Sequence, residues 1–243
     1  MLKQINDLTE FQITYREKIK AEAEASKHNP EHDKIHVSPC GKYTLRIEQR
    51  ERRCVGVLYE GEEILERIVR NYSFFPFDWA TGHPDGHDYL VCSENYQGQT
   101  LICLDKRERV DYLGAGESGG YAWIWANIQV SPDRKHIAVS GCHWAFPYEV
   151  RVFEFTNPMS QPGEPVFLPK DFSNMCRWLE DGSLEYGEEG DYCLLLNMFE
   201  DDMTDEQYKT SDKMFNEAIA QGQDEDDLWV CRIKNPQVWR PGT

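Results

Sequence analysis

The stretch "VSPDRKH" at residues 130–136 is a turn between an apolar run and a run in which apolar and polar residues alternate. Three related turns occur elsewhere, "VSPCGKY" at 37–43, "GHPDGHDY" at 82–89 and "LEDGSL" at 179–184. Counted at the proline, or at the glutamate that replaces it in the last turn, the four turns are 45, 48 and 48 residues apart. Proline at the second position of a β-turn, followed by Asp and Gly, is a favoured turn sequence. The spacing therefore predicts a repeated supersecondary unit.

Each repeat contains four runs with the pattern of β-strands, and one of these turns separates the first run from the second. In the third repeat the runs are "WANIQVS", "HIAVSG", "EVRVFEF" and "PVFLP". Alternation over such short runs is typical of half-buried strands. The sequence therefore predicts a mainly β chain of about four four-stranded antiparallel units. These units lie near residues 34–70, 75–113, 123–169 and 174–243.

Four antiparallel strands at this period resemble the blades of β-propellers of the WD-repeat or S-P-D-G type. The resemblance covers residues 34 to about 197 and rests on the turns, since the Gly-His and Trp-Asp pairs of true WD repeats are absent. It implies a propeller-like array and no particular activity, and it leaves the subfamily open. A β-sandwich is the alternative fold for the same strand pattern.

The two ends of the repeated region differ, because they contain helical patterns. Apolar residues recur at helical spacing from Leu8, which predicts an amphipathic helix at 8–26 within an N-terminal segment of residues 1–33. A second helix is predicted at 204–221, where "TDEQ" matches a capping box. It forms an insertion in the last unit of the β domain, residues 34–243. We expect both helices to cover open edges of the sheets.

The charge of the chain narrows the choice of partners. Asp and Glu number 43 against 26 Lys and Arg, which gives a formal net charge of −17. This charge repels nucleic-acid phosphates and favours a protein or peptide partner with a basic patch. No stretch resembles a signal peptide or approaches 18 consecutive apolar residues, so we expect a cytoplasmic protein outside the membrane. Eight cysteines, none in a C-x-x-C pair, predict reduced and buried thiols.

Two short motifs resemble catalytic or metal-binding sequences but lack the required context. "GESGG" at 116–120 matches G-x-S-x-G, yet a strand-like run follows Ser118 where a nucleophile elbow needs a helix. "HPDGHD" at 83–88 contains two histidines, although a turn needs its Asp and Gly residues for backbone geometry. We therefore predict no nucleophilic serine, no metal site and no cofactor.

The predicted binding site is formed by loops at one end of the array. In a four-stranded meander, the loops between second and third strands lie at the same end as the connections between units. Loops on a rigid scaffold are where binding residues concentrate, and aromatic residues with a polar rim are typical of protein or ligand sites. The residues predicted to bind a ligand or partner are Tyr96, Gln97, Tyr121, Trp123, His143, Trp144, Phe146 and Tyr148.

Two functions from different classes fit this loop end. The sequence favours a non-enzymatic module that binds a protein or peptide, because it contains no complete set of catalytic residues. The alternative is an enzyme or binding protein for a glycan or other polar small molecule, with two carboxylates acting as in glycosidases. The candidate carboxylates are Asp78, Glu94, Glu117 and Glu149. Glu94 and Glu149 occupy equivalent loops and form the first pair to compare, and the open strand edges of four units are compatible with a homodimer.

Overall fold

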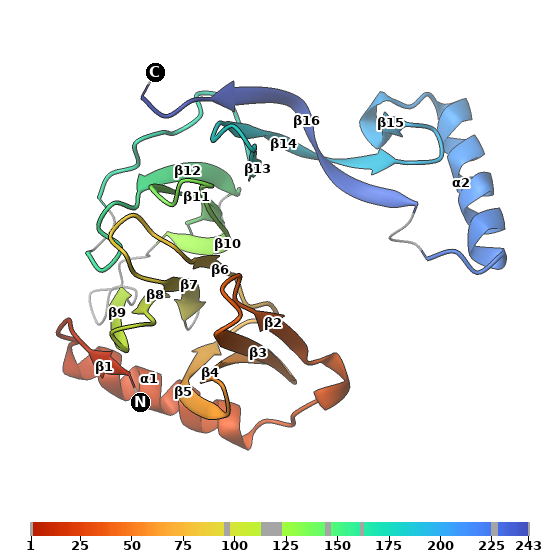
Figure 1. Cartoon of the computed structure of the whole chain (residues 1–243). Coiled ribbons are helices and arrows are strands. Elements are labelled where there is room, and N and C mark those ends of the chain that lie inside the picture. Colours follow the sequence, from red (N-terminus) through yellow and green to blue (C-terminus); the bar gives the residue numbers. More distant parts are fainter. Residues whose placement is uncertain are drawn as a thin grey trace.

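The computed structural model is mainly β in the part of the chain that it describes. The described residues are 2–94, 98–112, 123–143, 147–160, 163–224 and 228–242. Within them, the strands form several largely antiparallel sheets that follow one another in chain order, and two α-helices lie outside the sheets (Figure 1). This confirms the predicted fold class at the level of a mainly β array of antiparallel sheets.

The first two sheets contain all the strands that the repeat predicts for them. The first sheet has the order β2 (Lys34–Val37), β3 (Tyr43–Arg50), β4 (Arg53–Glu60) and β5 (Glu63–Arg70). The second has the order β6 (Phe77–Ala80), β7 (Tyr89–Glu94), β8 (Gly98–Cys103) and β9 (Glu108–Tyr112). A short N-terminal strand, β1 (Lys3–Gln4), adds to this sheet parallel to β9.

The third sheet has three strands and a poorly formed fourth. Its order is β10 (Ile124–Val130), β11 (His136–Cys142) and β12 (Glu149–Glu154). The run "PVFLP", predicted as the fourth strand, meets β12 at a single bridge between Val152 and Phe167. Pro165 and Pro169 at its two ends cannot donate a backbone hydrogen bond, which limits the pairing. The preceding connection follows β12, the edge strand of the sheet, and packs beside Trp125, Ile137 and Phe153.

The fourth sheet carries a long extension. Its strands are β13 (Met175–Trp178), β14 (Leu184–Cys193), β15 (Met198–Phe199) and β16 (Trp229–Trp239). β14 and β16 continue as a pair beyond the four residues that β14 shares with β13, as Figure 1 shows. Between β15 and β16 the chain forms a 3-10 turn, η2 (Glu200–Asp202), and the helix α2 (Asp205–Ala220). We call residues 188–234 the C-terminal extension.

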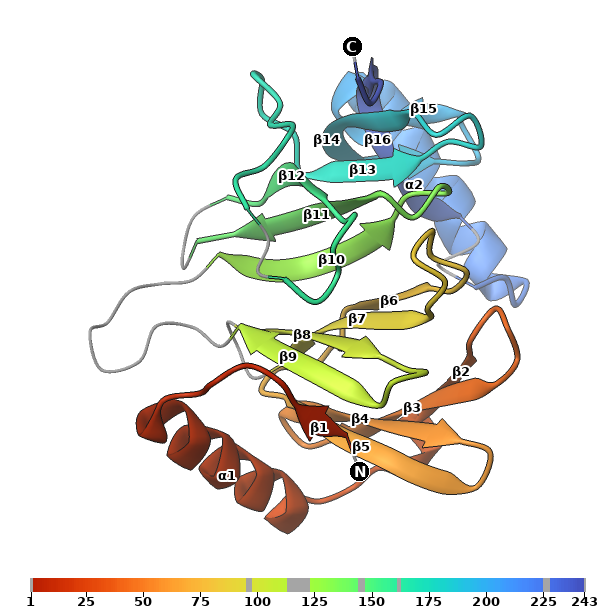
Figure 2. The ribbon, with the colours of Figure 1, turned by 60° about the vertical axis from the view of Figure 1, so that its left-hand side comes forward.

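Buried apolar side chains hold each sheet against the next. Figure 2 shows the sheets stacked in chain order. This follows from sequence alternation, because residues two apart along a strand point to the same face. Burial of each Leu, Ile or Val side chain contributes about 1.5–3 kcal/mol. Representative members are Leu45, Leu58 and Leu90 between the first and second sheets, Val91, Leu101 and Val139 between the second and third, and Val150, Val152 and Leu184 between the third and fourth.

The N-terminal helix α1 (Glu10–Ala25) covers the other face of the first sheet. Thr9 caps its start and forms a capping box with Gln12. Ile19 and Ala23 of α1 pack against valines of β4 and β5. The helix was expected at a sheet edge, but it lies on a face, because no further sheet packs there. Among the described residues, neither strand pairing nor a core cluster joins the fourth sheet to the first.

Other features of the fold concern the second helix, the cysteines and the lengths of the helices. The second helix begins with the predicted capping box between Thr204 and Gln207. All eight cysteine thiols are free, and six of them are buried. In the part of the chain that the structure describes, no helix has the length and apolar character needed to cross a membrane.

His136, the first residue of β11, lies where the third and fourth sheets meet. Its ring centroid is 5.7 Å from that of Trp239 and 6.3 Å from that of Trp178. Burial lowers the pKa of His136 below its ordinary value of 6.5, although the charges of Asp133 and Glu154 act in the opposite direction and Lys135 adds to the lowering. The folded chain therefore favours the neutral ring.

We predict that His136 makes the folded chain less stable as the pH falls below about 6.5, because the unfolded chain then binds a proton that the buried ring resists. Replacement of His136 by Gln should reduce the loss of stability between about pH 7.5 and pH 5.5. The measurement is the urea midpoint at both pH values, with His32→Gln, an exposed histidine, as the control. Equal acid-induced shifts in the wild type and in His136→Gln would contradict this assignment.

Candidate functional site

Glu94, the last residue of β7, lies in a buried group of charged side chains rather than in an open loop. Its side chain has 0% exposure. Arg16 of α1 donates to Oε2 at 2.9 Å, and Arg109 of β9 donates to the same oxygen at 2.8 Å. Burial raises the pKa of Glu94, and the two guanidinium groups oppose this effect. Glu94 therefore joins the N-terminal helix to the second sheet.

Asp111 of β9 completes this group. Arg109 donates to its Oδ1 at 2.6 Å, and Arg16 lies 2.8 Å from its Oδ2. Thr100 Oγ1 is within hydrogen-bond distance of both carboxylates, at 2.9 Å from Glu94 and 2.6 Å from Asp111, and can donate to one of them. Burial raises the pKa of Asp111, but Arg109, Arg16 and Thr100 together outweigh this effect and hold the pKa well below its ordinary range.

The carboxylate of Asp78 in β6 accepts hydrogen bonds from two backbone N–H groups. Its Oδ1 accepts from its neighbour Trp79 at 2.7 Å, and its Oδ2 accepts from the backbone of Val130 at 2.6 Å. Burial raises the pKa of Asp78. Because Val130 ends β10, this side chain connects the second sheet to the third. Asp78 and Glu94 thus have structural partners, and the fully buried Glu94 cannot share an open cleft with Glu149.

Glu149 and His143 meet around an arginine that the sequence analysis did not single out. Arg151 of β12 donates from Nε to Glu149 at 2.8 Å, and its Nη2 lies 3.4 Å from Nε2 of His143. The guanidinium carbon of Arg151 also stands 4.5 Å from the ring centroid of Trp123. A cation over an indole face contributes about 0.5–2 kcal/mol. Strand alternation places Glu149 and Arg151 on one face of β12, a signal available from the sequence.

Two of the remaining predicted residues lie in the described part of the chain. Trp123 is 8% exposed and belongs to the core between the second and third sheets, whereas Tyr148, directly before β12, is 42% exposed. The other predicted site residues lie outside the described residues, and so does Ser118. They are Tyr96, Gln97, Glu117, Tyr121, Trp144 and Phe146.

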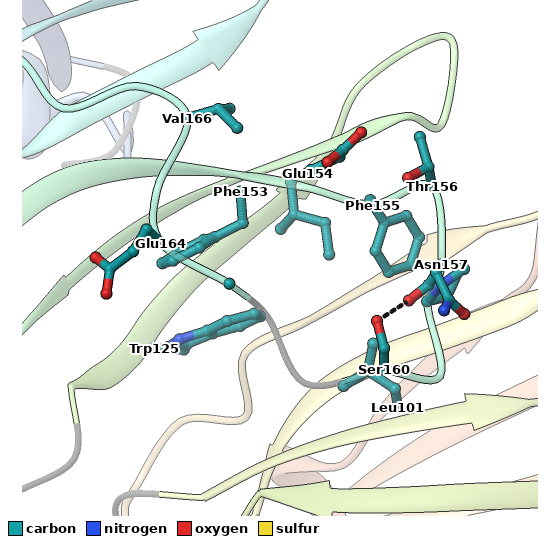
Figure 3. Close-up of a pocket in the computed structure, with 13 residues that line it drawn as sticks. Leu101, Trp125, Phe153, Glu154, Phe155, Thr156, Asn157, Ser160, Glu164 and Val166 are labelled. Atoms are coloured by element: carbon teal, nitrogen blue, oxygen red, sulfur yellow. Dashed lines mark hydrogen bonds between the residues drawn. The ribbon is translucent and has the colours of Figure 1, made fainter.

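A cavity of about 340 Å³ lies between the second and third sheets (Figure 3). Its apolar wall contains Trp125 and Phe153, whose rings are stacked with centroids 5.6 Å apart. The ring of Phe153 also lies 5.9 Å from that of Trp123, so the cavity continues the aromatic surface under Arg151. Its described lining residues are Leu101, Trp125, Ile137, Phe153, Glu154, Phe155, Thr156, Asn157, Pro158, Ser160, Gly163, Glu164 and Val166.

The other wall of the cavity is the connection that follows β12. Ser160 in this connection donates to the backbone carbonyl of Asn157 at 2.8 Å, as the dashed line in Figure 3 shows. Glu154 and Glu164 point away from each other in that view. The sequence analysis missed this cavity, which lies at the outer edge of the sheets and not in the predicted loops. The nine-residue connection "TNPMSQPGE" is the signal, because adjacent antiparallel strands usually need two to five residues.

The histidine-containing turn has a structural role in the described chain. His83 is 3% exposed, and its Nε2 lies 2.9 Å from the backbone carbonyl of Phe155. Asp85 accepts from the hydroxyl of Tyr89 at 2.6 Å. Among the described residues, no group of three His, Cys, Asp or Glu side chains is arranged to hold a metal ion.

No protein-family model matches the chain. A curated relative, "Uncharacterized protein R762" of Acanthamoeba polyphaga mimivirus, is 27% identical over 131 residues, which are 51% of this chain and 51% of the relative. The match thus spans about half the length of that relative.

Solved structures with similar folds include β-propellers at low identity. The Cps50 (Swd1) β-propeller domain of Myceliophteria thermophila aligns with a TM-score of 0.41 and 13% identity over 70% of this chain and 53% of its own. A protein from Lactobacillus plantarum has the same TM-score and identity over 72% and 57% of the two chains. A GH43 glycoside hydrolase aligns at 0.32 with 10% identity over 67% and 35%. At these TM-scores the similarities carry no argument about activity, and the description of the fold rests on the sheets themselves.

We predict that Arg109→Met lowers the free energy of unfolding by about 3–5 kcal/mol. The buried carboxylates of Glu94 and Asp111 then lose one of their two guanidinium partners, and their desolvation is no longer offset by its charge. The matched control is Arg107→Met, two residues away, whose side chain is 39% exposed and pairs with Glu60 and Glu63. It should cost about 1 kcal/mol or less. Urea denaturation at neutral pH measures both values, and equal losses for the two variants would refute the structural role of the buried group.

Proposed function

We propose that the chain is a non-enzymatic module that binds a protein or peptide partner at the outer edge between its second and third sheets. The observation that carries this proposal is the aromatic cavity of about 340 Å³ under the connection after β12. Binding pockets for small groups have volumes of about 300–1,000 Å³, with apolar walls and a few polar groups at the rim. An aromatic or aliphatic side chain of the partner is the expected occupant.

The surface next to the cavity adds polar contacts for such a partner. Arg151, Glu149 and His143 form a polar group beside the aromatic rings, and Tyr148 is exposed next to them. Interfaces typically combine buried aromatic anchors with a polar rim. The cavity supplies the place for an anchor, and these four residues supply the rim.

The alternative function, action on a glycan or other polar small molecule, has less support. Glycoside hydrolysis needs two carboxyl groups about 5–9.5 Å apart across one pocket. Glu94 is fully buried, Asp78 accepts two backbone hydrogen bonds, and Glu149 pairs with Arg151. Among the described candidates, each carboxylate thus has a partner within the fold.

We also propose that the four sheets are four propeller-type blades of a single β domain. In this description α1 covers the first blade, and the C-terminal extension continues from two strands of the last. A partner with a basic patch fits the net charge of −17, and a cytoplasmic location fits the free thiols of the eight cysteines. We also propose that two copies can associate through open strand edges, which light scattering tests.

Selection of a random peptide library on the immobilised chain tests the binding function. We expect enriched peptides to share an aromatic or aliphatic residue, and their affinity to fall about tenfold or more in the double variant Tyr148→Ala and Glu164→Arg. The control is Ile35→Ala with Glu62→Arg, which makes the same kinds of change at exposed positions of the first sheet. Absence of enriched peptides, or equal losses in both double variants, would rule out binding at this cavity.

A further inference from the structure

The C-terminal extension holds most of the net negative charge of the protein. Residues 188–234 contain 14 of the 43 acidic residues and 4 of the 26 basic ones, so this segment has a net charge of −10 out of −17. Figure 1 shows the extension reaching away from the rest of the sheets, with α2 at its outer end. Its surface is therefore accessible from several sides, and its field attracts cations over distances of about 8–10 Å.

A groove lies between α2 and the strand pair β14 and β16. Its volume is about 340 Å³. Successive turns of α2 place Tyr208, Asp212 and Phe215 on one side, because residues three and four apart share a helix face. The opposite side comes from Asp191, Glu200 and Trp229. Three aromatic rings and three carboxylates thus line one groove.

The three carboxylates of the groove have no cationic partner among the described residues, and Asp191 accepts only a long hydrogen bond from Cys231 Sγ at 3.7 Å. Among the described residues, no Lys, Arg or His nitrogen lies within 4.0 Å of the carboxylate oxygens of Asp191, Glu200 or Asp212. The charges of Asp212 and Glu200 raise the pKa of the Tyr208 phenol. The shared lining of the groove places this negative charge beside its aromatic rings.

The same extension already binds a cation with this combination of groups. Lys234 Nζ lies 3.0 Å from Asp202 and 3.6 Å from Asp201. It also stands 5.7 Å from the ring centroid of Phe199. An ammonium group between carboxylates and an aromatic face gains both ion-pair and cation–π energy. The groove offers the same chemistry with more aromatic surface.

We propose that the groove under α2 binds a lysine or arginine side chain from a basic peptide segment of a partner protein. The charge of the extension attracts the segment, and the aromatic rings and carboxylates of the groove hold one of its side chains. A metal ion is a poorer match, since no described group of three acidic, histidine or cysteine residues is arranged as a metal ligand set. This site is separate from the cavity beside β12 and does not depend on the function proposed for it.

Fluorescence anisotropy of labelled decalysine, with decaglutamate as the negative control, tests this proposal at low ionic strength. Glu200→Gln with Asp212→Asn should weaken decalysine binding about fivefold or more. The matched control is Glu217→Gln with Asp224→Asn, which removes two exposed charges of the same extension outside the groove and should weaken binding by about twofold or less.

Substitutions at Tyr208 separate the groove from the general field of the extension. Tyr208→Leu should weaken binding about threefold or more, whereas Tyr208→Phe keeps the ring and should bind as the wild type does. Tyr148→Ala, which changes the other proposed site, should leave decalysine binding unchanged. Equal losses in the two double variants, unchanged binding in Tyr208→Leu, or no preference for decalysine over decaglutamate would each overturn the proposal.

Discussion

The ion pairs of Arg16 and Arg109 with Glu94 and Asp111 are the interaction on which the arrangement of the first half of the chain depends. They join the N-terminal helix to two strands of the second sheet, across up to 95 residues of sequence. Desolvated charges cost several kcal/mol each, so the group is stable only when all its members are present. This requirement fixes α1 in one position. The helix then covers the face of the first sheet that no other sheet covers.

This arrangement determines which surfaces remain for partners. The faces between successive sheets are filled by apolar cores, and α1 covers the first sheet. The third sheet differs because prolines prevent a full fourth strand, and the connection folded over its edge leaves a cavity. The fourth sheet differs because two of its strands continue into the acidic extension. Both proposed binding sites therefore arise where the repeat is irregular.

The repeat itself could be predicted from sequence because turns and alternation are local. The turn at residues 130–136 and its three counterparts each separate the first and second strands of a sheet, and the capping box at Thr204 begins α2. The buried group around Glu94 could not be predicted, since its members are brought together only by packing of α1 on the second sheet. Glu94 therefore resembled a loop carboxylate in the sequence. The pairing of Glu149 with Arg151 on one face of β12 could have been predicted from strand alternation, but the contact of Arg151 with Trp123 could not, because packing brings these two residues together.

The central functional claim is that a partner binds between the second and third sheets. Hydrogen–deuterium exchange of the chain with and without a selected peptide tests it most directly, because exchange reports where backbone amides become protected. The account predicts slower exchange on peptide binding in residues 123–130 and 149–168, with unchanged exchange in α1 and the first sheet. Protection confined to the first sheet or α1, with no change in residues 149–168, would contradict it.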